Sequence, residues 1–135
     1  MFQLPTVQFT DQQQQFRLEV RSFLKAELEK GTFVSKCDSW LSGVNPAFSK
    51  CIGEQGWIGM TWPKKYGGQE RSTIDRYIVT EEFLAIGAPV AAHWFADRQT
   101  GPLLLRFGTE EQCEYFLPKI VKGECYFGIG LSEPN

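Results

Sequence analysis

Four times along this chain, a residue that caps the start of a helix is followed by an apolar stripe and then by a glycine. Threonine, serine and asparagine side chains accept hydrogen bonds from the free N–H groups of a first helical turn. Glycine favours the left-handed conformation that ends a helix. The pattern therefore predicts helices that start at Thr10, Asn45, Ser72 and Thr109 and end near Gly31, Gly56, Gly87 and Gly123.

Two of these starts carry a second signal. Thr10 and Thr109 are each followed three residues later by glutamine, which is the spacing of a capping box. After Thr10 the apolar residues recur three and four positions apart, which places them on one face of a helix. They are Phe16, Val20, Phe23, Leu24 and Leu28. We therefore expect this helix to bury a single stripe.

The remaining stretches are less regular. Residues 90–107 have a helical pattern, but Gly101-Pro102 should break or kink it into two short helices. Residues 57–71 carry no helical period, and we interpret them as a structured loop packed by its tryptophans. Residues 125–131 form the only convincing strand. The predicted fold class is all-α, an orthogonal bundle of about five or six helices with one orphan strand at the C-terminal end.

The orphan strand indicates that more of the fold lies elsewhere. A single strand leaves a row of backbone groups unpaired, and this chain offers it no partner. The chain then ends at Asn135, directly after Ser132-Glu133-Pro134. We therefore expect the chain to be the first part of something longer.

Composition excludes several classes of protein. With 135 residues, 42% of them hydrophobic, the chain can bury a core. Its net charge of -2 gives no basic face for nucleic acid. The longest uncharged stretch, residues 83–96, falls short of the roughly 20 residues that a membrane-spanning helix needs. We expect neither a nucleic-acid partner nor a membrane span.

Cysteine and histidine usage argues against a metal site and for a reducing compartment. The four cysteines form no C-x-x-C pair, and one histidine does not complete a typical zinc site. No basic residue precedes Arg17 and no apolar run follows the start, so no signal peptide is visible. We expect free thiols and a cytoplasmic location.

Residue by residue, the chain shows no catalytic constellation. His93 lies in an apolar helical stretch and is interpreted as a core histidine. Glu81 and Glu82 are adjacent, so they point about 100° apart on a helix and are expected on a solvated surface. Gly128-Ile129-Gly130 is followed by Glu133 where a dinucleotide fingerprint needs its third glycine.

Three segments together resemble the N-terminal helical domain of the acyl-CoA dehydrogenase family. They are GWIGMTWPKKYGG at residues 56–68, FGTEEQ followed by FLPKI and GE within residues 107–124, and GLSEP at residues 130–134. The resemblance implies that residues 1–124 form this helical domain and that residues 125–135 begin the family's middle β-domain.

The resemblance also implies a reaction and a cofactor. The family's enzymes contain FAD and desaturate acyl-CoA thioesters. A glutamate base removes the α proton and the β hydrogen leaves as hydride to the flavin. The base and the arginine that meets the flavin pyrophosphate belong to parts of the family fold that this chain lacks. No catalytic residue is therefore expected here, and the chain alone is expected to be inactive. The resemblance further implies a homo- or hetero-oligomer.

Carried over residue by residue, the resemblance names two groups of site residues. Ile129, Gly130, Leu131 and Ser132 match the strand that lies along the flavin ring. Glycines at 128 and 130 would let the backbone approach that ring closely, and the Ser132 hydroxyl would bond a ring heteroatom. Val90, Trp94 and Phe95 match the wall of the acyl-tail pocket.

Two interpretations from different classes stay open at this point. The first is part of an acyl-CoA dehydrogenase, or of a related oxidase acting on acyl-CoA or nitroalkanes. The second is a non-catalytic helical subunit that docks onto a partner supplying the flavin site. The acyl group, whether straight-chain, branched or a steroid side chain, is left open as well.

Overall fold

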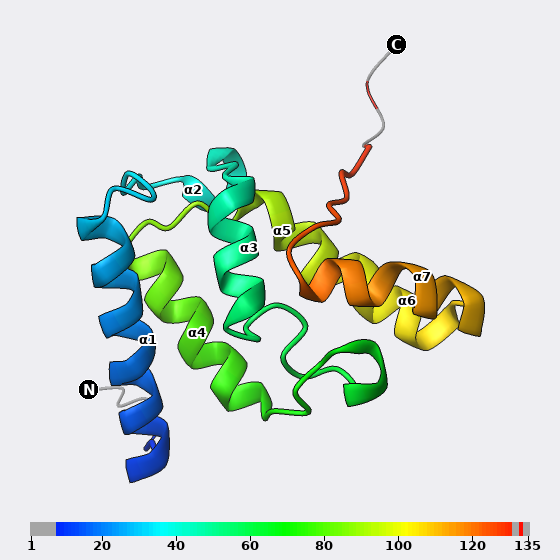
Figure 1. Ribbon diagram of the computed structural model, residues 1–135, viewed down its shortest axis with the longest axis horizontal. Coiled ribbons are helices and arrows are strands. Elements are labelled where there is room, and N and C mark those ends of the chain that lie inside the picture. Colours follow the sequence, from blue (N-terminus) through cyan, green and yellow to red (C-terminus); the bar gives the residue numbers. More distant parts are fainter. Residues whose placement is uncertain (1–7, 131–132, 134–135) are drawn as a thin grey trace, which may run out of the picture.

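The six predicted helices are present in the computed structural model, which describes residues 8–130 and residue 133 and confirms the all-α class (Figure 1). A short additional helix lies between the first two. The helices are α1 (Asp11–Glu29), α2 (Ser39–Ser42), α3 (Pro46–Glu54), α4 (Thr73–Ala85), α5 (Ala91–Phe95), α6 (Gly101–Phe107) and α7 (Glu110–Val121).

Local hydrogen bonds start the helices where the sequence predicts. At α1 the backbone N–H of Gln13 donates to Thr10 Oγ1 (3.2 Å), and the N–H of Thr10 donates to Gln13 Oε1 (2.9 Å). Thr109 and Gln112 form the same pair at the start of α7. Both capping boxes are therefore confirmed.

The core is built from α1, α3, α4 and α7 and from the loop after α3. In Figure 1, α1 runs alongside α4 at one end of the molecule, while α6 and α7 lie side by side at the other. The fully buried side chains come mainly from these core elements, and Ala96 of the α5–α6 stretch is fully buried as well. They include Val20, Leu24, Phe48, Ile52, Ile58, Met60, Ile78, Leu117 and Ile120.

The stretch from α5 to α6 contains a π-helical turn, η2 (Ala96–Thr100). Gly101 keeps a helical φ of -61°, so the chain passes from α5 through η2 into α6 rather than stopping before Pro102. The predicted division into two short helices is correct, but a widened helical turn separates them rather than a break at Gly101-Pro102. Proline has no N–H for the usual bond, and a π turn accommodates that loss.

The loop between α3 and α4 is ordered by its tryptophans, as predicted. Trp57 and Trp62 are buried. The backbone N–H of Glu70 donates to the Trp62 carbonyl (3.1 Å), and a short 3-10 helix, η1 (Lys64–Tyr66), lies between them. The ring of Trp62 lies against Gly101, where an added Cβ would come within 2.1 Å of it. The loop is thus packed against the start of α6.

The structure describes residues 125–130 of the predicted strand, and these residues do not form a strand. Residues 124–130 have no regular secondary structure, and Figure 1 shows this segment leaving α7 and running away from the helices. Leu131, the last residue of the prediction, lies outside the described residues. A strand is defined by a ladder of hydrogen bonds to a neighbour, and this segment finds none in the described chain.

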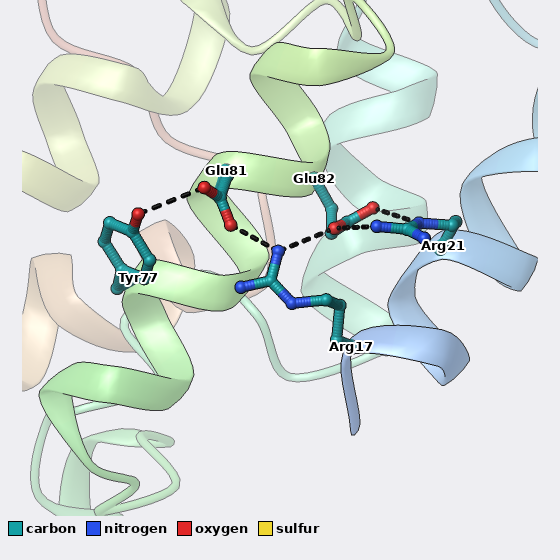
Figure 2. A network of polar contacts seen from close by, with 5 residues as sticks. All are labelled: Arg17, Arg21, Tyr77, Glu81 and Glu82. Atoms are coloured by element: carbon teal, nitrogen blue, oxygen red, sulfur yellow. Dashed lines mark hydrogen bonds and ion pairs between the residues drawn. The ribbon is translucent and has the colours of Figure 1, made fainter. Parts of the chain in front are cut away.

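Glu82 corrects a second prediction, because it is buried rather than solvated. Its side chain is 6% exposed and faces two arginines of α1 (Figure 2). Arg21 donates two hydrogen bonds of 2.8 Å to the carboxylate, and Arg17 donates one of 3.0 Å while also bonding Glu81. Tyr77 donates to the other oxygen of Glu81. This network joins α1 to α4.

None of the helices in the described part of the chain combines the length and the hydropathy needed to cross a bilayer. All four cysteines are free thiols; Cys113 is buried and Cys37 is exposed.

Candidate functional site

The segment that carries the predicted cofactor residues is anchored at its start and open at its end. Phe127 packs edge-on against Phe116 of α7 (5.7 Å between ring centres), and the Tyr126 hydroxyl donates to the Gly123 carbonyl. Beyond this anchor Ile129 is 47% exposed. An added Cβ on Gly128 or Gly130 would meet no atom within 4 Å. The backbone there is accessible to a planar ring, which fits the predicted flavin contact.

Leu131 and Ser132, the other two predicted cofactor residues, lie outside the described residues. Ile129 and Gly130 are their described neighbours. The assignment of all four residues to a cofactor stays a prediction.

The predicted acyl-pocket residues lie at both ends of α5. Val90 immediately precedes the helix and is fully buried in the core, so it supports the helix from within. Trp94 is half-buried, packs against Trp40 of α2 (6.1 Å between ring centres) and carries the Arg98 guanidinium over its ring. Phe95 is half-buried at the other end. Trp94 and Phe95 are therefore the two that reach the surface.

A buried carboxylate next to these residues was missed by the sequence reasoning. Asp97, in η2, accepts a 2.8 Å hydrogen bond from the backbone N–H of Gly59, and its Oδ2 lies 3.1 Å from Arg98 Nε. Burial raises the pKa of Asp97 against the opposing charge of Arg98, and burial lowers the pKa of Arg98. One sequence feature could have indicated a buried charge here: Asp97-Arg98 directly follows the longest uncharged stretch of the chain.

His93 is a core histidine, as predicted, and it has one specific partner. It is 3% exposed, and its Nδ1 lies 2.8 Å from the hydroxyl oxygen of Ser49 on α3. Burial, followed by the charge of Arg98, lowers the pKa of His93 to about 4. The imidazole is therefore neutral at pH 7 and acts here as a hydrogen-bonding group rather than as a charge.

The described side chains around α5 are either apolar or are polar groups that already have partners within the protein. Among the described residues, no group of three or more histidine, cysteine, aspartate or glutamate side chains could hold a metal ion. Three acidic residues are buried in the described chain, and all of them have partners: Glu27 pairs with Lys30 and Thr32, Glu82 with arginines, and Asp97 with the Gly59 backbone. Two features are open to a ligand: the aromatic side chains Trp94 and Phe95 at the end of α5, and the accessible backbone at Gly128 and Gly130. The first suits an apolar tail and the second a planar ring.

Comparison with known proteins decides the family. Residues 10–124 match the family model described as acyl-CoA dehydrogenase, N-terminal domain. The chain belongs to the acyl-CoA dehydrogenase family. The acyl-CoA dehydrogenase FadE26 of Mycobacterium tuberculosis is 36% identical to it over 134 residues, covering 96% of this chain and 33% of the relative. The mitochondrial isovaleryl-CoA dehydrogenase of Pongo abelii is 30% identical over 131 residues.

Solved structures of the family show the same fold. The ChsE4–ChsE5 complex of Mycobacterium tuberculosis contains a chain with a TM-score of 0.76 and 34% identity, covering 96% of this chain and 32% of that one. The Tcur3481–Tcur3483 steroid acyl-CoA dehydrogenase gives a TM-score of 0.80 and 30% identity, covering 96% and 34%. This chain spans about a third of the length of the curated relatives it matches.

Proposed function

We propose that this chain is the N-terminal helical part of a flavin-dependent acyl-CoA dehydrogenase. The observation that carries the proposal is the match of 96% of the chain to relatives that bear this activity in their names, at up to 36% identity. FAD, when bound, would accept the hydride that leaves the β carbon of an acyl-CoA. The catalytic base would come from the rest of the fold.

In this proposal the chain has two tasks. Residues 129–132 lie along the flavin ring, where the glycines at 128 and 130 leave the backbone accessible. Ser132 donates to a ring heteroatom. Trp94 and Phe95 at the surface of α5 line the acyl tail and exclude water from it. Val90 holds that helix end in the core.

The similar structures also suggest a substrate class and an assembly. Both are complexes of two different chains, and one of them is a steroid acyl-CoA dehydrogenase. We therefore propose a hetero-oligomer acting on a CoA thioester whose acyl part carries fused rings. Because the described cysteines are free thiols, we also propose a cytoplasmic location.

Replacing Ser132 by alanine tests the cofactor assignment. In the flavin-loaded enzyme, Ser132→Ala should shift the flavin absorption band and slow reduction by acyl-CoA about five-fold, because one hydrogen bond is worth roughly 1 kcal/mol. The matched control is Ser42→Ala, which alters an exposed serine on α2. Stopped-flow reduction and the absorption spectrum are the measurements. If both are unchanged in Ser132→Ala, the assignment is wrong.

The chain by itself should bind FAD weakly and desaturate no acyl-CoA. It supplies one accessible backbone segment and no described phosphate cradle, whereas FAD affinity needs many contacts to offset the loss of freedom on binding. Without a positioned base, about 10²–10⁴-fold in rate is lost as well. FAD titration and acyl-CoA-dependent dye reduction measure both. Micromolar binding with turnover would refute this expectation.

A related oxidase is the second candidate. The prolyl acyl carrier protein oxidase AnaB shares the fold with a TM-score of 0.64 and 27% identity. An oxidase passes the flavin's electrons to oxygen, so hydrogen peroxide formed in stoichiometric amounts without dye would favour it. A docking subunit without catalysis would give a different result. Flavin binding and turnover would then belong to its partner, so replacing Ser132 would leave both unchanged.

A further inference from the structure

The indole of Trp94 contacts two side chains that come from different elements. The Arg98 guanidinium of η2 lies over its ring, 5.0 Å from the ring centre. Trp40 of α2 packs against it with 6.1 Å between ring centres and 58° between ring planes. A cation over an indole and two tilted aromatic rings at this spacing both attract each other. Arg98, Trp94 and Trp40 therefore form one continuous group, which we call the tryptophan cluster.

Arg98 is itself held in place by two elements. Its Nη2 donates a hydrogen bond to Thr80 Oγ1 on α4, and its Nε lies 3.1 Å from Asp97 Oδ2 in η2. Thr80 in turn donates to the Arg76 carbonyl, one helical turn earlier (2.7 Å). The Arg98 side chain is 23% exposed and that of Asp97 8%, so water reaches this ion pair only in part. A planar guanidinium held in this way is a fixed partner for the indole.

Trp40 is fixed relative to Trp94 by backbone contacts between α2 and α5. The N–H of Ala91, the first residue of α5, donates to the carbonyl of Gly43, which directly follows α2 (3.1 Å). A Cβ added to Gly43 would lie 2.9 Å from Pro89 Cα, so the two backbones touch there. Trp40 is nonetheless 41% exposed. Part of a firmly placed indole is therefore available to an apolar ligand.

We propose that Trp40 is a specificity-determining residue that extends the wall of the acyl-tail pocket beyond Trp94, and that Arg98 is a positioning residue that holds Trp94 in that wall. This role rests on the proposed function, which assigns Trp94 to the acyl tail. Two adjoining indoles give a broader apolar surface than one, and the gain on binding follows the area removed from water. The cluster therefore favours a fused-ring acyl group over a short straight chain, and Arg98 acts only through Trp94.

The first experiment tests the cluster and needs no substrate. Two indoles in contact couple their ultraviolet transitions and give a paired positive and negative circular-dichroism band that neither indole gives alone. In the flavin-loaded enzyme, Trp40→Phe and Trp94→Phe should each remove this band, and the double variant should remove no more, because the band belongs to the pair. Tyr115→Phe, which alters an exposed tyrosine of α7, is the control and should leave the band in place. Additive changes in the two single variants overturn the proposal.

The second experiment tests whether Arg98 holds Trp94. Arg98→Met removes the guanidinium but keeps an extended side chain, so the paired band should weaken as the indole gains freedom. Arg106→Met is the matched control, since Arg106 lies over a different ring, that of the exposed Phe107, at the same distance of 5.0 Å. It should keep the wild-type band. A wild-type band in folded Arg98→Met overturns the positioning role.

A milder variant decides the same point if Arg98→Met does not fold. Arg98→Met leaves the buried carboxylate of Asp97 without its cation, which is costly. Thr80→Val keeps the shape of the side chain and removes only the oxygen to which Arg98 donates. It should weaken the paired band in the same direction. An unchanged band in Thr80→Val then overturns the positioning role.

The third experiment tests specificity with two substrates, naphthylpropanoyl-CoA and butanoyl-CoA. Both carry the α and β hydrogens that desaturation removes, but only the first has fused rings. Trp40→Ala should raise KM for naphthylpropanoyl-CoA about five-fold and leave KM and kcat for butanoyl-CoA near wild type. Folded Arg98→Met should show the same selectivity. Tyr115→Ala is the control and should keep both KM values. An equal change for both substrates in Trp40→Ala would show a merely structural role and overturns the proposal.

Flavin content and substrate choice separate this role from the proposed function. A wild-type enzyme that holds no flavin refutes the proposed function and, with it, the role of Trp40 in an acyl pocket. A flavin-loaded wild-type enzyme that desaturates butanoyl-CoA but not naphthylpropanoyl-CoA supports the function and overturns the role of Trp40. The circular-dichroism band decides the contacts of the cluster independently of both results.

Discussion

Gly123→Ala will lower the free energy of unfolding by about 3 kcal/mol. A left-handed backbone conformation costs an alanine about 1 kcal/mol relative to glycine, and overpacking against a fixed neighbour adds roughly 1–3 kcal/mol. Both apply, because Gly123 has a φ of +68° and its added Cβ would lie 2.3 Å from the Ser49 carbonyl oxygen. A backbone atom in the middle of α3 has little freedom to move away. Urea denaturation followed by circular dichroism measures the loss.

The matched control for this variant is Gly31→Ala. Gly31 has a nearly identical φ of +75°, but an added Cβ there meets no atom within 4 Å. Only the cost of the left-handed backbone conformation remains, so Gly31→Ala should lower the free energy of unfolding by about 1 kcal/mol. The difference between the two variants therefore measures the contact between the turn and α3. Equal losses in the two variants would show that the turn is not seated on α3.

Glu82→Gln will lower the free energy of unfolding at pH 7 by about 2 kcal/mol. Breaking a buried ion pair typically costs about 3–5 kcal/mol, and partial solvent access to Arg21 reduces the figure. Glutamine keeps the size of the side chain but offers one neutral oxygen to two guanidinium groups. Glu114→Gln on α7, where the side chain is exposed, is the control and should change stability little. A loss no greater than that of the control would contradict the prediction.

The cost of Glu82→Gln should also depend on pH. Hydrogen bonding to Arg21, opposed by burial, lowers the pKa of Glu82 in the folded protein. A carboxyl whose folded pKa is depressed contributes stability above its unfolded pKa, near 4.3, and loses it as the pH falls through the folded value. Wild type and variant should therefore converge as the pH is lowered below about 4. A difference that stays constant from pH 7 to pH 3 would show that ionisation of Glu82 contributes nothing.

The sequence by itself determined where the helices begin and end. The bonds that start α1 and α7 join residues three positions apart, and the glycines that follow α1, α3, α4 and α7 all adopt positive φ. These interactions are complete within one turn, so they can be read without knowing the fold. The spacing of the three motifs likewise identified the family, which the match over residues 10–124 confirms.

The candidate site could be predicted only in part. Resemblance placed the cofactor residues on a segment whose described glycines are accessible, and it placed the acyl pocket on α5. It did not show that Val90 is a core residue, or that Asp97 is buried beside the pocket helix. An apolar residue at the end of a helix has the same pattern whether it faces a core or a ligand.

Only the tertiary structure decided the partners of the buried polar groups. Glu82 meets Arg21 across 61 residues, and His93 meets Ser49 across 44. On the printed sequence Glu81 and Glu82 look alike, yet the packing of α1 against α4 buries one and leaves the other partly in water. The strand predicted near the C-terminal end is absent from the described residues for the same reason. A ladder of hydrogen bonds needs a neighbouring strand, and the described chain places none beside this segment. Local hydrogen bonds follow from adjacent residues, whereas burial and long-range pairing depend on how the helices pack.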